Sequence, residues 1–224
     1  MIQKMTEKIQ SHRQPLLIND LEGYGKVKKI ILASGSPRRK ELLEQIGVSF
    51  EIVKAEGEEV ITTEIPSEAV KELSRQKARE VAAKTDGDVI IGADTVVAVS
   101  GRILGKPKDA GDAVRMLKML QGKEHEVLTG VTLILKESGQ EICFAEATKV
   151  HVYPMTEEQI RSYVESGEPM DKAGAYGIQG RFAAYVSGIE GDYNTVVGLP
   201  VGRLYQEALA AGIDLTACGK DEKR

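Results

Sequence analysis

Short apolar runs alternate with segments of helical period along most of this chain, and that alternation limits its possible folds more than any other feature. Residues 29–33 form an apolar run that predicts a buried strand, and Leu42, Leu43 and Ile46 then share one face of a predicted helix over residues 38–46. Further strands are predicted over residues 48–53, 88–93, 96–99, 125–135, 142–153 and 182–189, and further helices over residues 66–84, 109–120, 157–166 and 201–211. Interleaved strands and helices predict an α/β fold with a mixed sheet.

The chain of 224 residues divides into three predicted parts. Residues 1–28 have mixed charge and no clear period, so we expect an N-terminal extension, followed by one domain over residues 29–214 and a C-terminal tail over residues 215–224. The formal net charge of −4 argues against a general nucleic-acid binder, which needs a basic surface to replace phosphate counterions. A nucleotide needs only a local basic pocket.

The cysteines and histidines show no metal-binding or disulfide pattern. Cys143 and Cys218 are far apart and form no CxxC motif, and His12, His125 and His151 share no ligand spacing. No apolar run approaches the roughly 20 residues of a membrane span, and basic residues interrupt the N-terminal segment where a signal peptide would be apolar. We therefore expect a cytoplasmic protein without a membrane partner.

The segment Ser34-Gly35-Ser36-Pro37-Arg38-Arg39 joins the first predicted strand to the first predicted helix. The N-terminus of a helix exposes unpaired N–H groups and carries partial positive charge, and small residues before it let a phosphate approach the backbone. The two arginines can add bidentate hydrogen bonds to phosphate oxygens. The alternative is a capped helix with two solvated arginines, and the segment does not match the Walker pattern.

Asp94 follows the apolar run 88–93 directly, at a position where open α/β sheets bind their ligands. A carboxylate there can hold a hard divalent cation, accept a proton from an attacking water, or merely cap a turn. Lys77 and Lys106 are either solvated surface lysines or the groups that neutralise phosphate charge during cleavage.

Two loops complete the candidate site. Residues 171–180 are rich in glycine and alanine, which predicts a tight backbone close to a ligand, and Gln179 offers both a donor and an acceptor to the edge of a base. The alternative is a flexible surface loop. The acidic residues 56–59 either solvate a loop or provide one carboxylate that completes a magnesium site with Asp94.

Six segments in order resemble the Maf family of nucleoside triphosphate pyrophosphatases. They are ILASGSPRRKELLEQIGV, SRQKA, IGADTVV, LGKPKDAGDAVRML, DKAGAYGIQG and VVGLPV, between about residues 30 and 209. The resemblance implies hydrolysis of the α–β phosphoanhydride of a nucleoside triphosphate, which yields a monophosphate and pyrophosphate. It also implies a two-lobed fold around a long mixed sheet, similar to inosine-triphosphate-type pyrophosphatases, with the active cleft between the lobes.

The resemblance also assigns roles to residues of this chain. It makes Asp94 the proton acceptor and places Glu58, Lys77 and Lys106 in the same pocket. The charge of a triphosphate also favours a divalent cation, Mg²⁺ or Mn²⁺ or Co²⁺ in its place, held by Asp94 and Glu58. The sequence does not decide whether Asp94 is the base, a metal ligand or both. The residues expected to bind the substrate are Ser34, Arg38, Arg39, Thr95, Lys172 and Gln179. Among these, Arg38, Thr95 and Gln179 are associated with substrate choice.

The segment from Lys172 to Gly180 resembles the subgroup that acts on dTTP and UTP, rather than the subgroup that acts on 7-methyl-GTP. The implied role is removal of non-standard nucleotides from the nucleotide pool, with a link to arrest of septum formation and cell division. Two alternatives are a non-catalytic nucleotide-binding regulator of septum formation and a purine-specific house-cleaning enzyme. A homodimer is compatible with an enzyme of this size.

Overall fold

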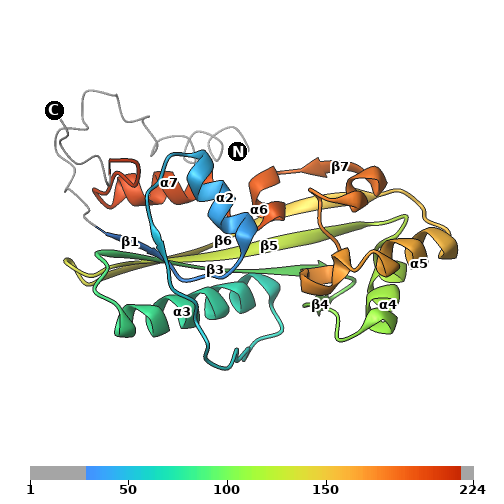
Figure 1. The fold of residues 1–224 in the computed structure, drawn as a ribbon, viewed down its shortest axis with the longest axis horizontal. Helices are drawn as coiled ribbons and strands as arrows, with labels where there is room; N and C mark the ends of the chain where they lie inside the picture. Colours follow the sequence, from blue (N-terminus) through green and yellow to red (C-terminus); the bar gives the residue numbers. More distant parts are fainter. Residues whose placement is uncertain (1–28, 218–224) are drawn as a thin grey trace, which may run out of the picture.

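The computed structural model describes residues 29–217, so the predicted N-terminal extension and most of the predicted tail lie outside the described residues. Within this range the chain forms one sheet of seven strands with helices packed against it (Figure 1). The strands follow the order β2-β1-β3-β5-β6-β7, and β4 pairs with β3. The predicted α/β class with a mixed sheet is therefore confirmed.

The elements have the following bounds. The strands are β1 (Ile30–Leu32), β2 (Glu51–Ile52), β3 (Val89–Val99), β4 (Arg102–Leu104), β5 (Glu124–Leu135), β6 (Gln140–Val152) and β7 (Val186–Glu190). The α-helices are α2 (Pro37–Gln45), α3 (Pro66–Lys84), α4 (Ala110–Leu120), α5 (Glu157–Glu165), α6 (Tyr193–Val197) and α7 (Val201–Ala210). Three 3₁₀ helices follow α5, namely η2 (Glu168–Asp171), η3 (Ala173–Ala175) and η4 (Arg181–Tyr185).

The sheet is parallel at one end and antiparallel elsewhere. β1 pairs in parallel with β2 and β3, whereas β3, β5, β6 and β7 pair antiparallel. β1 contacts residues 89–91 of β3 and β4 contacts residues 97–99, both on the edge opposite β5. No strand in the described part of the chain pairs with this edge over residues 92–96. The sheet therefore has an opening in the middle of β3.

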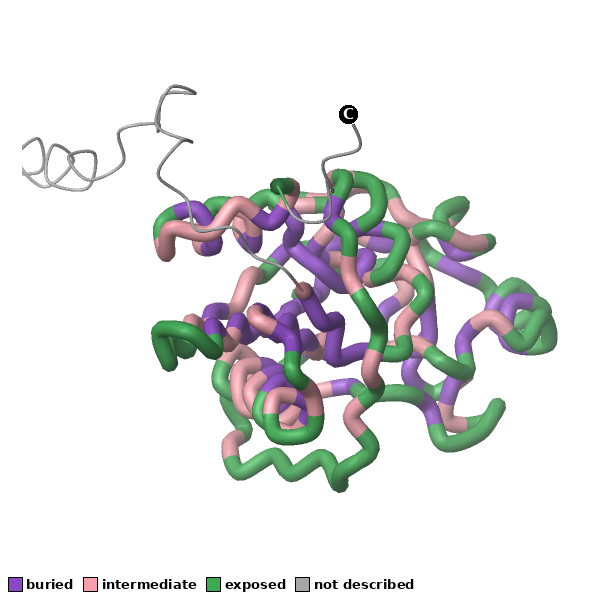
Figure 2. Tube along the Cα trace, turned by 60° about the vertical axis from the view of Figure 1, so that its left-hand side comes forward, coloured by how far each residue is buried: buried purple, intermediate pink, exposed green. Residues whose placement is uncertain are grey.

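Two apolar clusters lie along the long strands and form two lobes. Val89 and Ile91 pack with α2 and α7, whereas Val97 and Val99 at the other end of β3 pack with α4 and α5. Because successive side chains of a strand point to opposite faces, Ile90 packs toward α3 instead. Figure 2 shows the buried part of the trace in the middle of the molecule, with exposed segments around it. The predicted two-lobed arrangement is confirmed.

Two glycines let α3 lie unusually close to the sheet. A Cβ atom at Gly92 of β3 would lie 2.4 Å from the carbonyl oxygen of Ser74, and one at Gly130 of β5 would lie 2.2 Å from that of Val70. Real Cβ atoms do not approach backbone this closely, so any larger residue would push the helix outward. These contacts fix the distance between α3 and β3.

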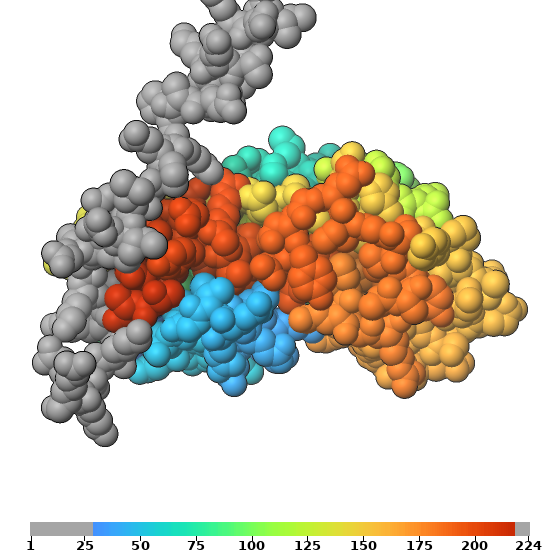
Figure 3. All heavy atoms as spheres, turned by 90° about the horizontal axis from the view of Figure 1, so that it is seen from above, coloured from blue at the N-terminus to red at the C-terminus, as the bar shows by residue number. Residues whose placement is uncertain are grey.

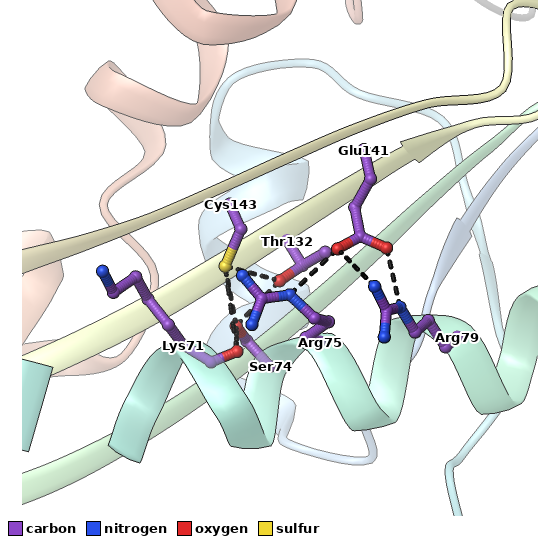
Figure 4. A network of polar contacts seen from close by, with 7 residues as sticks. All are labelled: Lys71, Ser74, Arg75, Arg79, Thr132, Glu141 and Cys143. Atoms are coloured by element: carbon purple, nitrogen blue, oxygen red, sulfur yellow. Dashed lines mark hydrogen bonds and ion pairs between the residues drawn. The ribbon is translucent and has the colours of Figure 1, made fainter. Parts of the chain in front are cut away.

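Polar side chains hold α3 in register on the same face (Figure 4). Ser74 and Thr132 of β5 share a buried hydrogen bond of 2.9 Å between their hydroxyl oxygens. Toward the C-terminal half of the helix, Arg75 and Arg79 both donate to the carboxylate of Glu141 on β6, at 2.9 and 2.8 Å. The helix is therefore attached to two different strands.

Local sequence signals predicted several elements correctly. The helix predicted over residues 66–84 has the bounds of α3. The predicted capping box of α5 is present, because Thr156 Oγ1 accepts from the backbone N–H of Gln159 at 3.2 Å and Gln159 Oε1 accepts from the N–H of Thr156 at 2.8 Å.

Other local predictions were wrong. β3 continues through the interruption predicted at Asp94, because Asp94 pairs with Gly130 of β5 as any strand residue would. β2 has two residues instead of the predicted run 48–53. The strand predicted over residues 182–189 begins as η4, since Phe182 turns inward and is fully buried.

The predicted C-terminal tail begins at Leu215. Leu215 is fully buried and belongs to the apolar cluster that covers α7. The first residue of the predicted tail thus packs against the domain. Separately, none of the helices within residues 29–217 is both long and apolar enough to span a membrane.

Candidate active site

A cleft of about 850 Å³ lies between the two lobes, at the opening in the edge of β3. The loop from β1 to α2, the middle of β3, the segment from η2 to Gly180 and residues 196–198 line it. A volume of this size is typical of small-molecule sites, which measure about 300–1,000 Å³. The cleft contains all the predicted site residues but one, namely Ser34, Arg38, Arg39, Lys77, Asp94, Thr95, Lys106, Lys172 and Gln179.

The N-terminus of α2 opens into the cleft. Ser36 is the N-cap residue but makes no side-chain capping bond, and Pro37 occupies the first helical position. The backbone N–H groups of Arg38 and Arg39 in the first turn therefore have no partner within the helix. Unpaired N–H groups and the partial positive charge of a helix end are the features from which the sequence predicted phosphate binding here.

Arg39 connects three walls of the cleft. Its guanidinium donates to the Oγ of Ser34 at 3.0 Å, to the Oγ1 of Thr95 at 3.0 Å and to the carbonyl oxygen of Gly198 at 2.8 Å. Figure 3 shows the consequence on the surface, where the segment containing α2 (blue) lies against the C-terminal part of the domain (orange to red). Burial lowers the pKa of Arg39, although the charge of Asp94 opposes the shift. Because three bonds fix the guanidinium of Arg39, they also fix the direction of its remaining N–H groups.

Asp94, Lys77 and Glu59 form the centre of the site. The Lys77 ammonium contacts Asp94 and lies 2.8 Å from the carboxylate of Glu59. Lys77 and Asp94 are both largely buried, with 16% and 13% of their side chains exposed, whereas Glu59 is 57% exposed. One cation therefore links two carboxylates at different depths in the cleft.

The pKa of Glu59 reflects this arrangement. Burial alone would raise it, but the hydrogen bond and charge of Lys77, together with the charges of Lys106 and Arg39, lower it below its ordinary value. Glu59 is thus held in its ionised form beside Asp94.

Glu59, rather than the predicted Glu58, lines the cleft. Helix α3 fixes the acidic loop on both sides of Glu59: Glu80 accepts the backbone N–H groups of residues 56 and 57, and Gln76 Oε1 accepts that of Val60 at 3.0 Å. The first of these bonds contributes most to lowering the pKa of Glu80, to about 2. The sequence could not distinguish two adjacent glutamates, because their orientation depends on these bonds to α3.

Asp94 lies in the cleft for a different reason from the predicted one. Its strand does not end there, but the parallel neighbour β1 ends at Leu32, opposite Ile91 of β3. Asp94 therefore lies just beyond the carboxyl end of β1, at the opening. Lys54, which follows the short strand β2, also lines the cleft and was missed. Applying the same strand-end argument to β2 would have found it.

Ion pairs join two basic residues of the cleft lining, Arg38 and Lys172, to Asp171. Arg38 of α2 donates to Asp171 at the end of η2, with 3.1 Å between the nitrogen and oxygen atoms. Lys172 Nζ binds the other Asp171 oxygen at 2.6 Å and the carbonyl oxygen of Glu168 at 2.6 Å. Arg38 and Lys172, which were both predicted to bind the substrate, are thus linked through Asp171.

The segment 171–180 is not the flexible surface loop of the alternative prediction. Tyr176 is buried, and its hydroxyl lies 2.7 Å from the Nε2 of His125 on β5. Ile178 packs against the apolar cluster around α2 and α7. Gln179 lies between these anchors and the end of the segment, is exposed, and lines the cleft. None of the described residues bonds to the side-chain amide of Gln179, so the amide is free to bind a ligand.

The cleft is strongly basic in an acidic protein. Its basic residues are Arg38, Arg39, Lys54, Lys77, Lys106 and Lys172, and its acidic residues are Glu59, Asp94 and Asp171. The formal excess is three positive charges, against a net charge of −4 for the chain. The cleft thus has the opposite sign of charge to the whole chain, which suits a polyanionic ligand.

Comparison with known proteins agrees with this geometry. The family model described as Maf-like protein matches residues 29–210. The chain belongs to the Maf-like protein family. A family member from Agathobacter rectalis, named dTTP/UTP pyrophosphatase, is 58% identical over 205 residues, which cover 84% of this chain and all of that protein. A family member of the same name from Carboxydothermus hydrogenoformans is 58% identical over 179 residues, covering 80% of this chain and 96% of its own.

A solved structure also resembles this Maf-like chain. It is titled nucleoside-triphosphatase / dITP/XTP pyrophosphatase, from Mycobacterium abscessus, and is 20% identical to the chain. The comparison covers 82% of this chain and 97% of that one, with a TM-score of 0.41.

Proposed function

We propose that the chain is a nucleoside triphosphate pyrophosphatase that hydrolyses dTTP and UTP to the monophosphate and pyrophosphate. Relatives that share more than half of their residues with it carry the name dTTP/UTP pyrophosphatase. The observation that carries the proposal is the placement of Asp94, linked to Lys77, at the floor of a cleft with excess positive charge. Binding alone would not require a carboxylate at this position, where it repels phosphate.

The two ends of the substrate are bound by different segments of the cleft lining. The N–H groups of α2, the remaining donors of Arg39 and the ammonium of Lys106 bind the triphosphate. Gln179 on the 177–180 turn binds the edge of the base. The scissile α–β linkage then lies over the middle of β3.

Asp94 acts there as the general base. It accepts a proton from a water molecule whose oxygen attacks one of the two phosphorus atoms of the α–β bridge. The bond from that phosphorus to the bridging oxygen breaks, and its electrons leave with the departing phosphate group. Lys77 orients Asp94 before the reaction and offsets the charge on the phosphate oxygens during it.

We also propose a divalent cation, Mg²⁺ or Mn²⁺ or Co²⁺ in its place, held by Asp94 and Glu59. Residues 29–217 contain no cluster of three or more histidine, cysteine, aspartate or glutamate residues that could hold a metal without the substrate. Two carboxylates fit magnesium, which commonly binds one or two carboxylates and completes its shell with phosphate oxygens and water. When bound, the cation supplies Lewis-acid charge to the phosphate oxygens.

A panel of triphosphates tests the proposal. Purified protein is incubated with dTTP, UTP, CTP, canonical purine triphosphates and 7-methyl-GTP, and released pyrophosphate is measured as phosphate after adding inorganic pyrophosphatase. We expect the fastest release from dTTP and UTP. Nucleotide binding without release would favour the alternative of a non-catalytic regulator of septum formation, and faster release from a purine nucleotide would contradict the pyrimidine assignment. Homodimerisation and a cytoplasmic location stay predictions.

A further inference from the structure

The turn that presents Gln179 is held by two residues outside the cleft. The turn spans residues 177–180 and is closed by a hydrogen bond of 3.2 Å from the N–H of Gly180 to the carbonyl oxygen of Gly177. Neither Tyr163 of α5 nor Glu168 of η2 lines the cleft. Both nevertheless contact the turn from behind.

The Glu168 carboxylate uses both of its oxygens in this contact. Oε1 accepts from the hydroxyl of Tyr163 at 2.9 Å, and Oε2 accepts from the backbone N–H of Arg181, directly after the turn, at 3.0 Å. A Cβ atom at Gly180 would lie 2.1 Å from Oε1, so the carboxylate fills the space that a side chain would need there. At the start of the turn, the N–H of Gly177 donates to the Tyr163 hydroxyl over a longer 3.4 Å.

Tyr163 is a rigid support for this carboxylate. It is 4% exposed, and its ring packs against Phe182, with 5.2 Å between the ring centroids. Phe182 also packs against Tyr176, at 4.6 Å between centroids. Since Tyr176 precedes the turn and Phe182 follows Arg181, the two ends of the segment are clamped to the same aromatic cluster.

We propose that Tyr163 and Glu168 are positioning residues for base selection: the carboxylate of Glu168, oriented by the hydroxyl of Tyr163, fixes the 177–180 turn and thereby the place of Gln179. The inference rests on the proposed hydrolysis of pyrimidine triphosphates. It separates base recognition from phosphate binding, because Arg39, one of the proposed phosphate-binding groups, is held by Ser34, Thr95 and Gly198 and not by the turn. Loosening the turn therefore weakens the choice of base and leaves the binding of pyrophosphate unchanged.

Three variants and one control test this. Glu168→Ala removes both contacts, Tyr163→Phe removes one oxygen atom, and Glu168→Gln keeps an acceptor for Arg181 and a polar partner for Tyr163. The control is Glu165→Ala, an exposed glutamate at the end of α5. For each we would measure kcat and KM with UTP and CTP, inhibition by inorganic pyrophosphate, and the melting temperature.

For Glu168→Ala we expect the KM for UTP to rise and the UTP-over-CTP preference in kcat/KM to fall, each by about tenfold, with kcat within about twofold of the wild type. Inhibition by pyrophosphate stays the same. Tyr163→Phe shows a smaller change in the same direction, Glu168→Gln restores most of the preference, and Glu165→Ala behaves like the wild type.

An unchanged preference in a folded Glu168→Ala variant would overturn the proposal, as would an equal loss of pyrophosphate affinity. If Glu168→Ala does not fold, an unchanged preference in Tyr163→Phe overturns it instead. If the wild type hydrolyses no triphosphate, the proposed function fails. Calorimetric binding of UMP and CMP to the wild type and the variants then tests the role of the turn separately: the same UMP-over-CMP preference in all of them overturns that role, and its loss in Glu168→Ala supports it.

Discussion

Lys77 on α3 contacts Asp94 in the middle of β3, across the interface where the helix lies closest to the sheet. The contact depends on Gly92 and Gly130, whose missing side chains let the helix approach. The position of the proposed general base thus depends on packing as well as on its own strand.

The first prediction concerns Asp94 itself. Replacing it by asparagine keeps the size and an acceptor for Lys77 but removes the proton acceptor, so we expect kcat for pyrophosphate release from dTTP to fall by about 1,000-fold. Circular dichroism and the melting temperature should show an intact fold. Asp86→Asn is the matched control, because Asp86 lies on the surface before β3 and is 84% exposed; its activity should stay within about twofold of the wild type. Undiminished release by Asp94→Asn would refute the catalytic role.

The second prediction distinguishes two adjacent glutamates. EDTA should abolish activity and Mg²⁺ should restore it, and Glu59→Gln should raise the Mg²⁺ concentration for half-maximal activity by about tenfold, as the loss of one supporting carboxylate does in other metal sites. Glu58→Gln should leave that concentration unchanged, since Glu58 does not line the cleft. A larger effect of Glu58→Gln would return the metal site to Glu58, the glutamate predicted from the sequence.

The third prediction tests the close approach of α3. A methyl group at Gly130 meets only backbone atoms of the helix, so Gly130→Ala should lower the free energy of unfolding by about 3 kcal/mol and separate Lys77 from Asp94. Gly202→Ala is the control: no atom lies within 4 Å of a Cβ there, and alanine is the better helix former. We expect it to stabilise the protein by about 0.5 kcal/mol. Urea denaturation measures both, and equal stability of the two variants would contradict the packing described above.

The fourth prediction uses the buried pair of His125 and Tyr176. Burial lowers the pKa of His125 to about 4, so the folded protein keeps the ring neutral while the unfolded chain takes up a proton below about pH 6.5. Between these values the unfolded state binds more protons, and stability must fall as the pH decreases. The contribution of His125 to this loss is about 3 kcal/mol from pH 6.5 to pH 4.

His125→Gln measures that contribution, because glutamine does not titrate in this range. Its free energy of unfolding, from urea curves at several pH values, should fall less steeply with acid than that of the wild type. His151→Gln, at a half-buried histidine on β6, should retain the steep dependence. Parallel curves for the wild type and His125→Gln would show that His125 does not titrate in this window.

Elements were predictable where the signal is local. The capping box of α5 needs only Thr156 and Gln159, and the bounds of α3 follow from Pro66 and the apolar period after it. The strand predicted across Phe182 was wrong because an aromatic ring can be buried equally well by a strand or by a 3₁₀ turn. Its contacts with Tyr163 and Tyr176 select the turn, and these partners are distant in sequence.

The candidate site, too, was predictable only in part from the sequence. The resemblance to a family brought Ser34, Asp94 and Gln179 together, and the structure places them in one cleft. It could not show that Glu59 lies beside Lys77, which depends on bonds from the loop to α3. The resemblance also gave no reason to single out Glu168. The proposed role of Glu168 depends on its bond to the backbone N–H of Arg181, and any residue other than proline would provide that N–H.

The opening in the edge of β3 has a consequence for how the protein avoids self-association. A strand edge without a neighbour is a template on which another chain can add a strand. Here β1 and β4 leave only residues 92–96 of this edge open, and Asp94, Thr95 and Val96 of that stretch line the cleft. The gap is too short and too enclosed for a second polypeptide, yet wide enough for a small polar molecule. The same interruption that forms part of the cleft therefore offers little strand edge to a second chain.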